Sequence, residues 1–349
     1  MKILRAAAGL ACILMPLAGA PAQPPASVAQ SARPVAVEQV AIENPGQAPM
    51  VVNIWHPAAL PGGAPADEAG SEASVGGDGL PLVVVSHGTG AGPMSHVDTA
   101  QALAGAGFVV VAPMHRGDNF QDDSSVGRPE WMANRARDVS EAIDFMLQGW
   151  RGRTHVDPSR VGIFGFSAGA TTALISIGGV PDLARLAPHC AARREFACAL
   201  MAPQAATAAL PPPAWIHDRR IAAAVIAAPG LGFTFEPSGL STVRVPVQLW
   251  VGAEDQTVPY ETNAAVVRRL LPQPPDFHSV DGAVHLSFLA PCGPDTPRPL
   301  CQDQAGFDRS AFHRDFNQAV IDFFRRHLPA PTSAYRRSSP QGRRPASGQ

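Results

Sequence analysis

Lysine is almost absent from this chain, because Lys2 is the only one in 349 residues. A Ser-Lys dyad or a Schiff-base mechanism is therefore excluded once the N-terminal segment is removed. Charged residues make up only 16% of the sequence and the formal net charge is -2, so no broad basic surface for nucleic acid is expected. Hydrophobic residues make up 46%, which allows a large core and argues against disorder throughout.

Cysteine is also scarce, with five residues and no C-x-x-C pair, which makes zinc the weaker interpretation and predicts no metal site. Cys12 lies in the N-terminal apolar run, and four cysteines remain beyond it. An even number suggests disulfides in an exported protein, with three possible connectivities. The close spacing favours Cys190 with Cys198 and Cys292 with Cys301.

The N-terminus has the order of a secretory signal peptide. Lys2 and Arg5 precede an apolar run at 6–18, and an A-x-A pattern follows at 20–22. A transmembrane anchor is the alternative, but the run is shorter than the roughly 20 residues that a bilayer crossing needs, and a proline interrupts it. We therefore predict a signal peptide at 1–22, a periplasmic or secreted protein, and no stable membrane span after cleavage.

Short apolar runs alternate with helical patterns between residues 35 and 328. Strands are predicted at 35–42, 50–55, 82–85, 108–112, 160–164, 221–227, 247–251 and 277–280, and helices at 96–106, 132–147, 170–177, 260–271 and 310–327. This alternation predicts one α/β domain with a mostly parallel central sheet and helices on both faces.

Three segments fall outside this pattern. Residues 62–79 are rich in small and acidic residues and predict a surface loop. Residues 181–220 are too long for an ordinary helix-to-strand connection and predict a cap-like insertion over the site. The tail at 329–349 is rich in proline, serine and arginine and is predicted to be disordered.

The sequence Gly-Phe-Ser-Ala-Gly at residues 165–169 places Ser167 between a predicted strand and a predicted helix. The two glycines allow strand and helix to approach closely, so the serine hydroxyl projects from a tight turn. Glycine and serine at these offsets also occur by chance, so the pattern needs support from other residues. A serine nucleophile requires a base and a carboxylate that orients the base.

Asp255 and His285 are the candidates for these two roles. Each follows a predicted strand that lies beyond the serine in the chain, in the order expected for sheets of this kind. Asp255 has an alternative role as a helix cap, and Glu254 is the reserve acid. The other late histidines, His278, His313 and His327, lie within predicted elements.

Two backbone amides are predicted to form an oxyanion hole. The amide of Ala168 follows the nucleophile at a helix N-terminus. The second donor is predicted to be Thr89, in the glycine-bearing loop at 86–90 that follows the strand at 82–85. His87 in the same loop has a possible catalytic role, but hydrogen bonding that fixes the loop is favoured.

These motifs resemble the α/β-hydrolase superfamily, and more closely the bacterial dienelactone-hydrolase-like group and its platelet-activating-factor acetylhydrolase relatives. The segments at 109–113, 115–119 and 157–162 support the resemblance, which covers roughly residues 35–328. It implies hydrolysis of a small-molecule or lipid-like carboxylic ester through an acyl-enzyme, without metal or organic cofactor. Dienelactone hydrolases proper use a cysteine nucleophile, so their lactone specificity does not carry over to Ser167.

Two alternatives to an esterase stay open. An amidase or peptidase would use the same triad, since acyl transfer from an amide needs the same groups. A catalytically silent α/β-hydrolase scaffold used for binding is disfavoured by the complete triad pattern and by both glycines of the turn.

Overall fold

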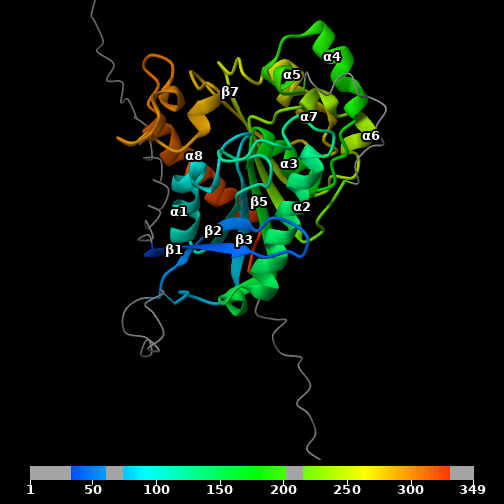
Figure 1. The fold of residues 1–349 in the computed structure, drawn as a ribbon. Coiled ribbons are helices and arrows are strands. Elements are labelled where there is room, and N and C mark those ends of the chain that lie inside the picture. The colour runs from blue at the N-terminus through cyan, green and yellow to red at the C-terminus, as the bar shows by residue number, and fades with distance from the viewer. Residues whose placement is uncertain (1–32, 60–73, 202–214, 331–349) are drawn as a thin grey trace, which may run out of the picture. The chain divides into compact units, whose positions relative to one another are not determined.

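Eight strands form one sheet in the computed structural model of the protein, which describes residues 33–59, 74–201 and 215–330 (Figure 1). The predicted signal peptide at 1–22 lies outside the described residues, as does the predicted tail from residue 331 onward. Most of the predicted loop at 62–79 and residues 202–214 of the predicted insertion lie outside them too.

The sheet has the strand order β1-β2-β4-β3-β5-β6-β7-β8. β2 pairs antiparallel with β1 and with β4, and every other neighbouring pair is parallel. The mostly parallel sheet expected from the sequence is therefore confirmed. The strands are β1 Val35–Ile42, β2 Met50–Pro57, β3 Leu80–Ser86, β4 Val109–Pro113, β5 Val156–Phe166, β6 Ile221–Ala227, β7 Val247–Gly252 and β8 Asp276–Val280.

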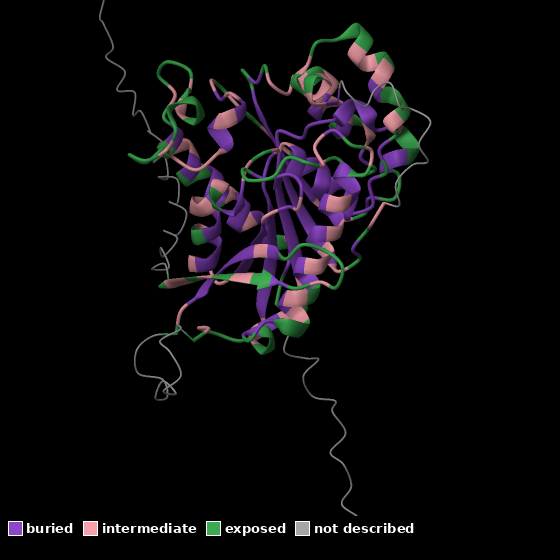
Figure 2. Ribbon diagram, in the orientation of Figure 1, coloured by how far each residue is buried: buried purple, intermediate pink, exposed green. Residues whose placement is uncertain are grey.

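Helices cover both faces of the sheet because its central strands are apolar on both sides. In β3, Leu82 and Val84 face one core cluster, whereas Val83 and Val85 face the other. α1 (Val97–Gly105) and α8 (Arg309–His327) pack on the second cluster, and α2 (Trp131–Asp144), α3 (Ala168–Ser176) and α7 (Ala264–Leu270) pack on the first. Figure 2 shows the strands buried between these two layers.

The predicted helix at 260–271 is divided in the structure, and this prediction was wrong in detail. A 3-10 turn, Tyr260–Thr262, ends at Asn263, whose φ of -120° and ψ of -87° are not helical, and α7 begins after it. The Asn263 side chain explains the break, since it accepts a hydrogen bond from the Gly232 amide at 3.0 Å and donates to the Pro259 carbonyl at 3.1 Å. The predicted helix at 132–147 likewise ends as α2 at Asp144 and continues as a π-helical turn, Phe145–Gly149.

The described part of the predicted insertion contains two short helices, α4 (Leu186–Ala192) and α5 (Phe196–Met201). A disulfide between Cys190 and Cys198 joins them. Leu186 and Met201 belong to a third buried cluster that includes residues of α2 and α3, so this segment packs on the helices beside the sheet. The remaining short helix is α6 (Pro237–Leu240).

Across the three described ranges, no helix combines the length and hydropathy that a bilayer crossing requires.

Gly169 allows α3 to lie directly against β3, because a Cβ atom at this position would be 1.9 Å from the Ser86 carbonyl oxygen. We expect Gly169→Ala to lower the free energy of unfolding by about 3 kcal/mol, despite a helix-propensity gain of about 1 kcal/mol. Urea denaturation measures the change. Gly293→Ala is the control, since its nearest contact would be Thr296 at 4.0 Å, and it should shift stability by less than about 0.5 kcal/mol. Equal effects of the two variants would contradict the steric argument.

Candidate active site

Ser167 occupies the sharp turn between β5 and α3, with φ of 56° and ψ of -118°. A positive φ is unfavourable for serine, and here neighbouring backbone groups hold it. The Ser167 amide donates to the Ala227 carbonyl at 2.9 Å, and its carbonyl accepts from the Ala170 amide at 3.0 Å. A Cβ at Gly165 would lie 2.1 Å from the Gly169 carbonyl oxygen, so the turn requires both glycines. The backbone therefore presents the hydroxyl at the carboxyl end of β5.

The structure brings Ser167, His285 and Asp255 together although they are far apart in the chain. His285 Nε2 lies 2.9 Å from Ser167 Oγ, and His285 Nδ1 lies 2.7 Å from Asp255 Oδ2. His285 and Asp255 are both buried. Because a carboxylate only accepts hydrogen bonds, Nδ1 carries the proton and Nε2 is left with a lone pair directed at the serine hydroxyl.

Asp255 holds a local turn and is not a helix cap, because the helical segments that follow it have Pro259 and Asn263 at their N-caps and no side-chain cap. Its Oδ1 accepts from the amides of Thr257 at 3.0 Å and Val258 at 2.8 Å, while Oδ2 faces His285. The two roles use different oxygens of one carboxylate. They are compatible, and the turn amides fix the side chain in the orientation that His285 requires.

Glu254, the reserve acid, and the other late histidines make different contacts. Glu254 is exposed, and its hydrogen bond to the Ala283 carbonyl is made by its backbone amide. His278 stacks on Trp250 at 4.0 Å, and His313 contacts Asp98 at 2.6 Å.

Thr89 and Ala168 both line the smaller cavity beside Ser167. The two amides that follow Thr89 are occupied, since the Gly90 amide donates to Asp118 Oδ1 at 2.7 Å and the Ala91 amide donates to the Gly88 carbonyl at 3.2 Å. Within the described ranges, the amides of Thr89 and Ala168 have no hydrogen-bond acceptor. Both amides are therefore available to an oxygen bound beside Ser167.

A buried ion pair supports the loop that carries Thr89. Arg135 Nη1 lies 2.5 Å from Asp118 Oδ2, and both side chains are completely buried. Asp118 also accepts from the Trp131 indole at 2.7 Å, while Arg135 donates to Thr172 Oγ1 at 3.0 Å and to the His87 carbonyl. The pair thus connects the loop with α2 and α3. Sequence reasoning included Asp118 only within a supporting segment and missed Arg135, because a helical arginine looks like a solvent-exposed residue.

His87 and His115 lie behind the same loop. The His87 Nδ1 donates to the Gly88 carbonyl at 2.7 Å, so its Nε2 accepts the His115 amide at 3.3 Å. Burial lowers the pKa of both histidines well below the usual value, and the Arg135 charge adds to the effect. Both rings are therefore neutral near pH 7. The geometry matches the loop-fixing role that was favoured for His87.

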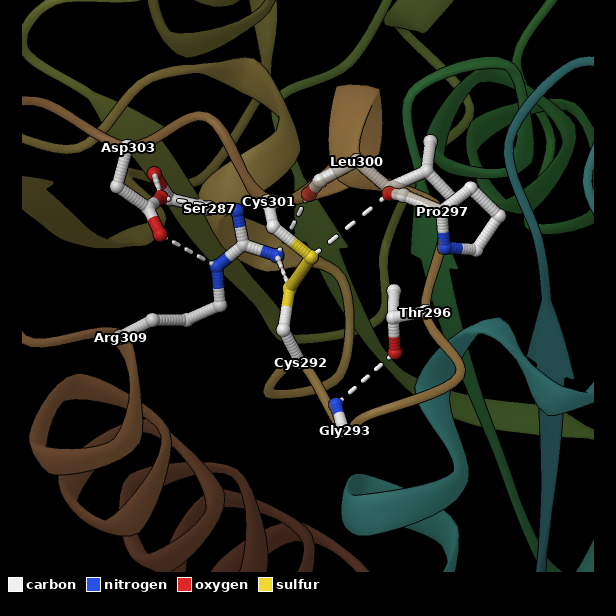
Figure 3. Close-up of a disulfide and its surroundings, with 9 residues drawn as sticks. All are labelled: Ser287, Cys292, Gly293, Thr296, Pro297, Leu300, Cys301, Asp303 and Arg309. Carbon is white, nitrogen blue, oxygen red and sulfur yellow. Dashed lines mark hydrogen bonds and ion pairs between the residues drawn. A yellow bond between two sulfur atoms is a disulfide. The ribbon is translucent and has the colours of Figure 1, made fainter.

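A second network supports the loop that carries His285. Ser287 Oγ donates to Asp303 Oδ1 at 2.6 Å, and Asp303 Oδ2 accepts a hydrogen bond from Arg309 Nε at 2.9 Å (Figure 3). From the other side, His313 donates to the Ser287 carbonyl at 2.9 Å. The disulfide between Cys292 and Cys301 closes the segment between this loop and Asp303. Within the described ranges, both disulfides have the pairing favoured by the spacing.

Two cavities meet at Ser167. The larger, of about 630 Å³, is lined by the loop at 88–95, by His285 and by Leu286. The smaller, of about 30 Å³, is lined by Ala168, Gly230 and residues of α5. Among the described residues, no group of histidine, cysteine and carboxylate side chains could hold a metal ion.

Taken together, the sheet order, the serine on its strand-to-helix turn and the following acid and histidine define an α/β-hydrolase. The model of the dienelactone hydrolase family matches residues 72–207. The chain thus has the α/β-hydrolase fold, and over the matched region it is similar to the dienelactone hydrolase family. The matched region includes the Thr89 loop and Ser167 but ends before Asp255 and His285.

A ferulic acid esterase from Streptomyces cinnamoneus is among the solved structures that share this fold. The TM-score is 0.56 at 20% sequence identity, over 90% of this chain and 96% of the esterase chain. A search of curated proteins found no match.

We expect Asp118→Asn to lower the free energy of unfolding by about 3–5 kcal/mol, because it leaves the Arg135 charge buried without its carboxylate. Glu236→Gln is the matched control. It removes a carboxylate that pairs with Arg185 at 2.6 Å, but both side chains are more than two-fifths exposed, so the loss should stay below about 1 kcal/mol. Urea unfolding compares the two, and similar losses would mean that burial does not set the cost.

His96 gives a prediction for the pH dependence of stability. Its buried ring packs edge-on against Phe164 and Phe166, with Asp98 and His313 as the nearby titratable groups. Burial lowers the pKa of His96 from 6.5 to about 4, and Asp98 only partly opposes the shift. Between these values the unfolded chain binds a proton that the folded chain does not. Stability therefore falls as the pH drops below 6.5, until the pH reaches about 4.

His96→Phe should reduce this loss without abolishing it, because His87 and His115 titrate in the same direction. Between pH 8 and pH 5 the wild type should lose about 2 kcal/mol more than the variant. Urea midpoints at both pH values test this, and parallel pH profiles would contradict it.

Proposed function

We propose that the protein is an exported serine hydrolase that cleaves carboxylic esters through an acyl-enzyme. The observation that carries the proposal is the continuous chain from Ser167 Oγ through His285 to Asp255, with steps of 2.9 and 2.7 Å. These separations allow proton transfer from the hydroxyl to Nε2 without rearrangement. Ser167 is the proposed nucleophile, His285 the general base and then acid, and Asp255 the group that orients the imidazole.

In the first half-reaction, Ser167 Oγ bonds to the ester carbonyl carbon as its proton passes to His285 Nε2. The carbonyl oxygen becomes an oxyanion, for which the amides of Thr89 and Ala168 are the proposed donors. Collapse of the intermediate breaks the bond to the alcohol oxygen, which takes the proton from His285. Water then repeats the sequence on the acyl-enzyme and releases the acid.

The buried pair of Asp118 and Arg135 supports the proposed role of Thr89. Asp118 holds the Gly90 amide at 2.7 Å, and Arg135 holds the His87 carbonyl, so the backbone on both sides of Thr89 is fixed. Donors that are already oriented need no reorganisation as charge develops on the substrate.

Export is supported by two disulfides among the described residues and by the charge and hydropathy of the N-terminal segment. The proposed signal peptide is 1–22, the hydrolase domain 35–328 and the disordered tail 329–349. The proposed location is the periplasm or the exterior of the cell. The proposed chemistry requires no metal or organic cofactor, since each step is assigned to a residue of the chain.

Ser167→Ala should abolish labelling by a fluorophosphonate probe and lower kcat for a p-nitrophenyl ester by up to about 10⁶-fold, since the nucleophile is lost. Ser159→Ala removes an exposed serine on β5 whose only hydrogen-bond partner among the described residues is Asp157, and it should leave both readouts unchanged. Labelling is followed by mass spectrometry and kcat by release of p-nitrophenol. Undiminished hydrolysis by the alanine variant would refute the nucleophile assignment.

The same assay separates the rival functions. A p-nitrophenyl ester and the p-nitroanilide of the same acid differ only in the scissile bond, and we expect a higher kcat/KM for the ester. Preference for the anilide would identify an amidase or peptidase. Failure of the wild type to react with the probe would indicate a silent scaffold.

A further inference from the structure

The large cavity beside Ser167 has an apolar wall with little charge. His285 is the only ionisable side chain among the described residues that line its 630 Å³. Leu286 and Leu289 form the wall next to His285, and Met94, Phe120 and Leu300 lie at the opening. A carboxylate, phosphate or ammonium group in this space would find no residue of opposite charge, so the lining favours an uncharged occupant.

The opening is also unusually apolar for a protein surface. Six large hydrophobic side chains are exposed in the described part of the chain, and four of them, Met94, Phe120, Phe196 and Leu300, line this one cavity. Single exposed apolar residues are ordinary, but their concentration at one opening indicates a binding surface.

Two members of this rim are held in place by the fold. The Phe120 ring lies against Gly92, where a Cβ atom would be 3.0 Å from the ring, and the Phe120 amide donates to the Ala91 carbonyl at 2.9 Å. Leu300 precedes the disulfide-bonded Cys301, and its carbonyl accepts from Arg309 Nη1 at 2.9 Å. The apolar surface is therefore preformed, and a ligand does not have to order it.

The position of His285 decides which part of an ester enters this cavity. In the proposed reaction, His285 Nε2 protonates the departing alcohol, so the alcohol oxygen must lie beside the imidazole. His285 lines the large cavity, whereas the small cavity of about 30 Å³ is lined by Ala168 and not by His285. The alcohol part therefore points into the large cavity and the acyl part points away from it.

From these observations we infer that the enzyme selects esters by their alcohol, and that the preferred alcohol is bulky, apolar and uncharged. The inference rests on the proposed function, because it assigns the leaving group through the role of His285. It locates the main source of substrate selectivity in the rim and wall of the large cavity.

Two series of linear esters test this on the full-length protein. In acetates of ethanol, butanol and hexanol, kcat/KM should rise by about two- to fourfold per added methylene, because each methylene leaves water for the cavity. In ethyl esters of acetic, butanoic and hexanoic acid, the rise should be much smaller. Hexyl acetate and ethyl hexanoate are isomers, so their ratio compares the two sides directly. An equal or higher value for ethyl hexanoate would overturn the inference.

A charged analogue of hexyl acetate tests whether the preferred alcohol is uncharged. 6-Acetoxyhexanoate has the six-carbon chain of hexyl acetate and ends in a carboxylate. We expect its kcat/KM to be at least about tenfold lower, because the carboxylate loses its hydration without gaining a partner. Equal rates would overturn the claim that the cavity selects uncharged alcohols.

Variants at the rim of the large cavity test whether its apolar residues cause the alcohol selectivity. Met94→Glu and Leu300→Glu should each lower the hexyl-to-ethyl acetate ratio by at least about threefold. Val37→Glu adds the same charge at an exposed position on β1 that does not line the cavity, and it should leave the ratio unchanged. All three sites are exposed, and circular dichroism checks folding. An unchanged ratio in both rim variants would overturn the assignment.

The fluorophosphonate probe distinguishes failure of this inference from failure of the proposed function. If the probe labels Ser167 and ethyl acetate is hydrolysed while the alcohol has no influence, the inference fails and the proposed function stands. If neither labelling nor hydrolysis occurs, both fail.

Discussion

The candidate site depends on a single buried ion pair, between Asp118 and Arg135 at 2.5 Å. Both side chains make further hydrogen bonds. Asp118 accepts from the Gly90 amide and the Trp131 indole, and Arg135 donates to Thr172 and to the His87 carbonyl. The pair therefore joins the loop after β3 to both helices that flank the serine. A buried pair is costly to desolvate, and apolar residues of similar volume would often be as stable. Its value lies in fixing the direction of backbone groups, which an apolar contact cannot do.

Sequence reasoning identified the fold because the underlying signals are local. Buried parallel strands read as short apolar runs, and all eight predicted strands are present with ends shifted by a few residues. The Ser167 turn, Asp255 and His285 were found because each follows a strand, and carboxyl ends of parallel strands share one edge of the sheet. Arg135 gave no such signal, since nothing in a helical pattern indicates which arginine is buried. The break at Asn263 was missed for a similar reason, because its partner Gly232 lies 31 residues away.

The two loops that carry Thr89 and His285 at the candidate site are supported in different ways. The Thr89 loop is held by a buried ion pair and neutral histidines, whereas the His285 loop is held by the hydrogen bonds of Ser287, Asp303 and Arg309 together with a disulfide. Burial lowers the pKa of His87 and His115, which keeps the first support free of additional positive charge. The second support includes the segment of Leu300, so the same covalent closure that steadies the histidine loop also shapes one side of the apolar opening.

The two oxygens of the Asp255 carboxylate have different partners, and this restricts which residue can occupy the position. One oxygen serves two turn amides and the other serves the imidazole, so the position requires acceptors at both ends of a planar group. Asparagine has nearly the same shape but only one oxygen. Whichever way its amide turned, an NH₂ group would face a donor: either the turn would lose its cap or the imidazole would lose its acceptor. Local folding and the proposed proton transfer thus impose the same requirement on residue 255, and neither can relax it independently.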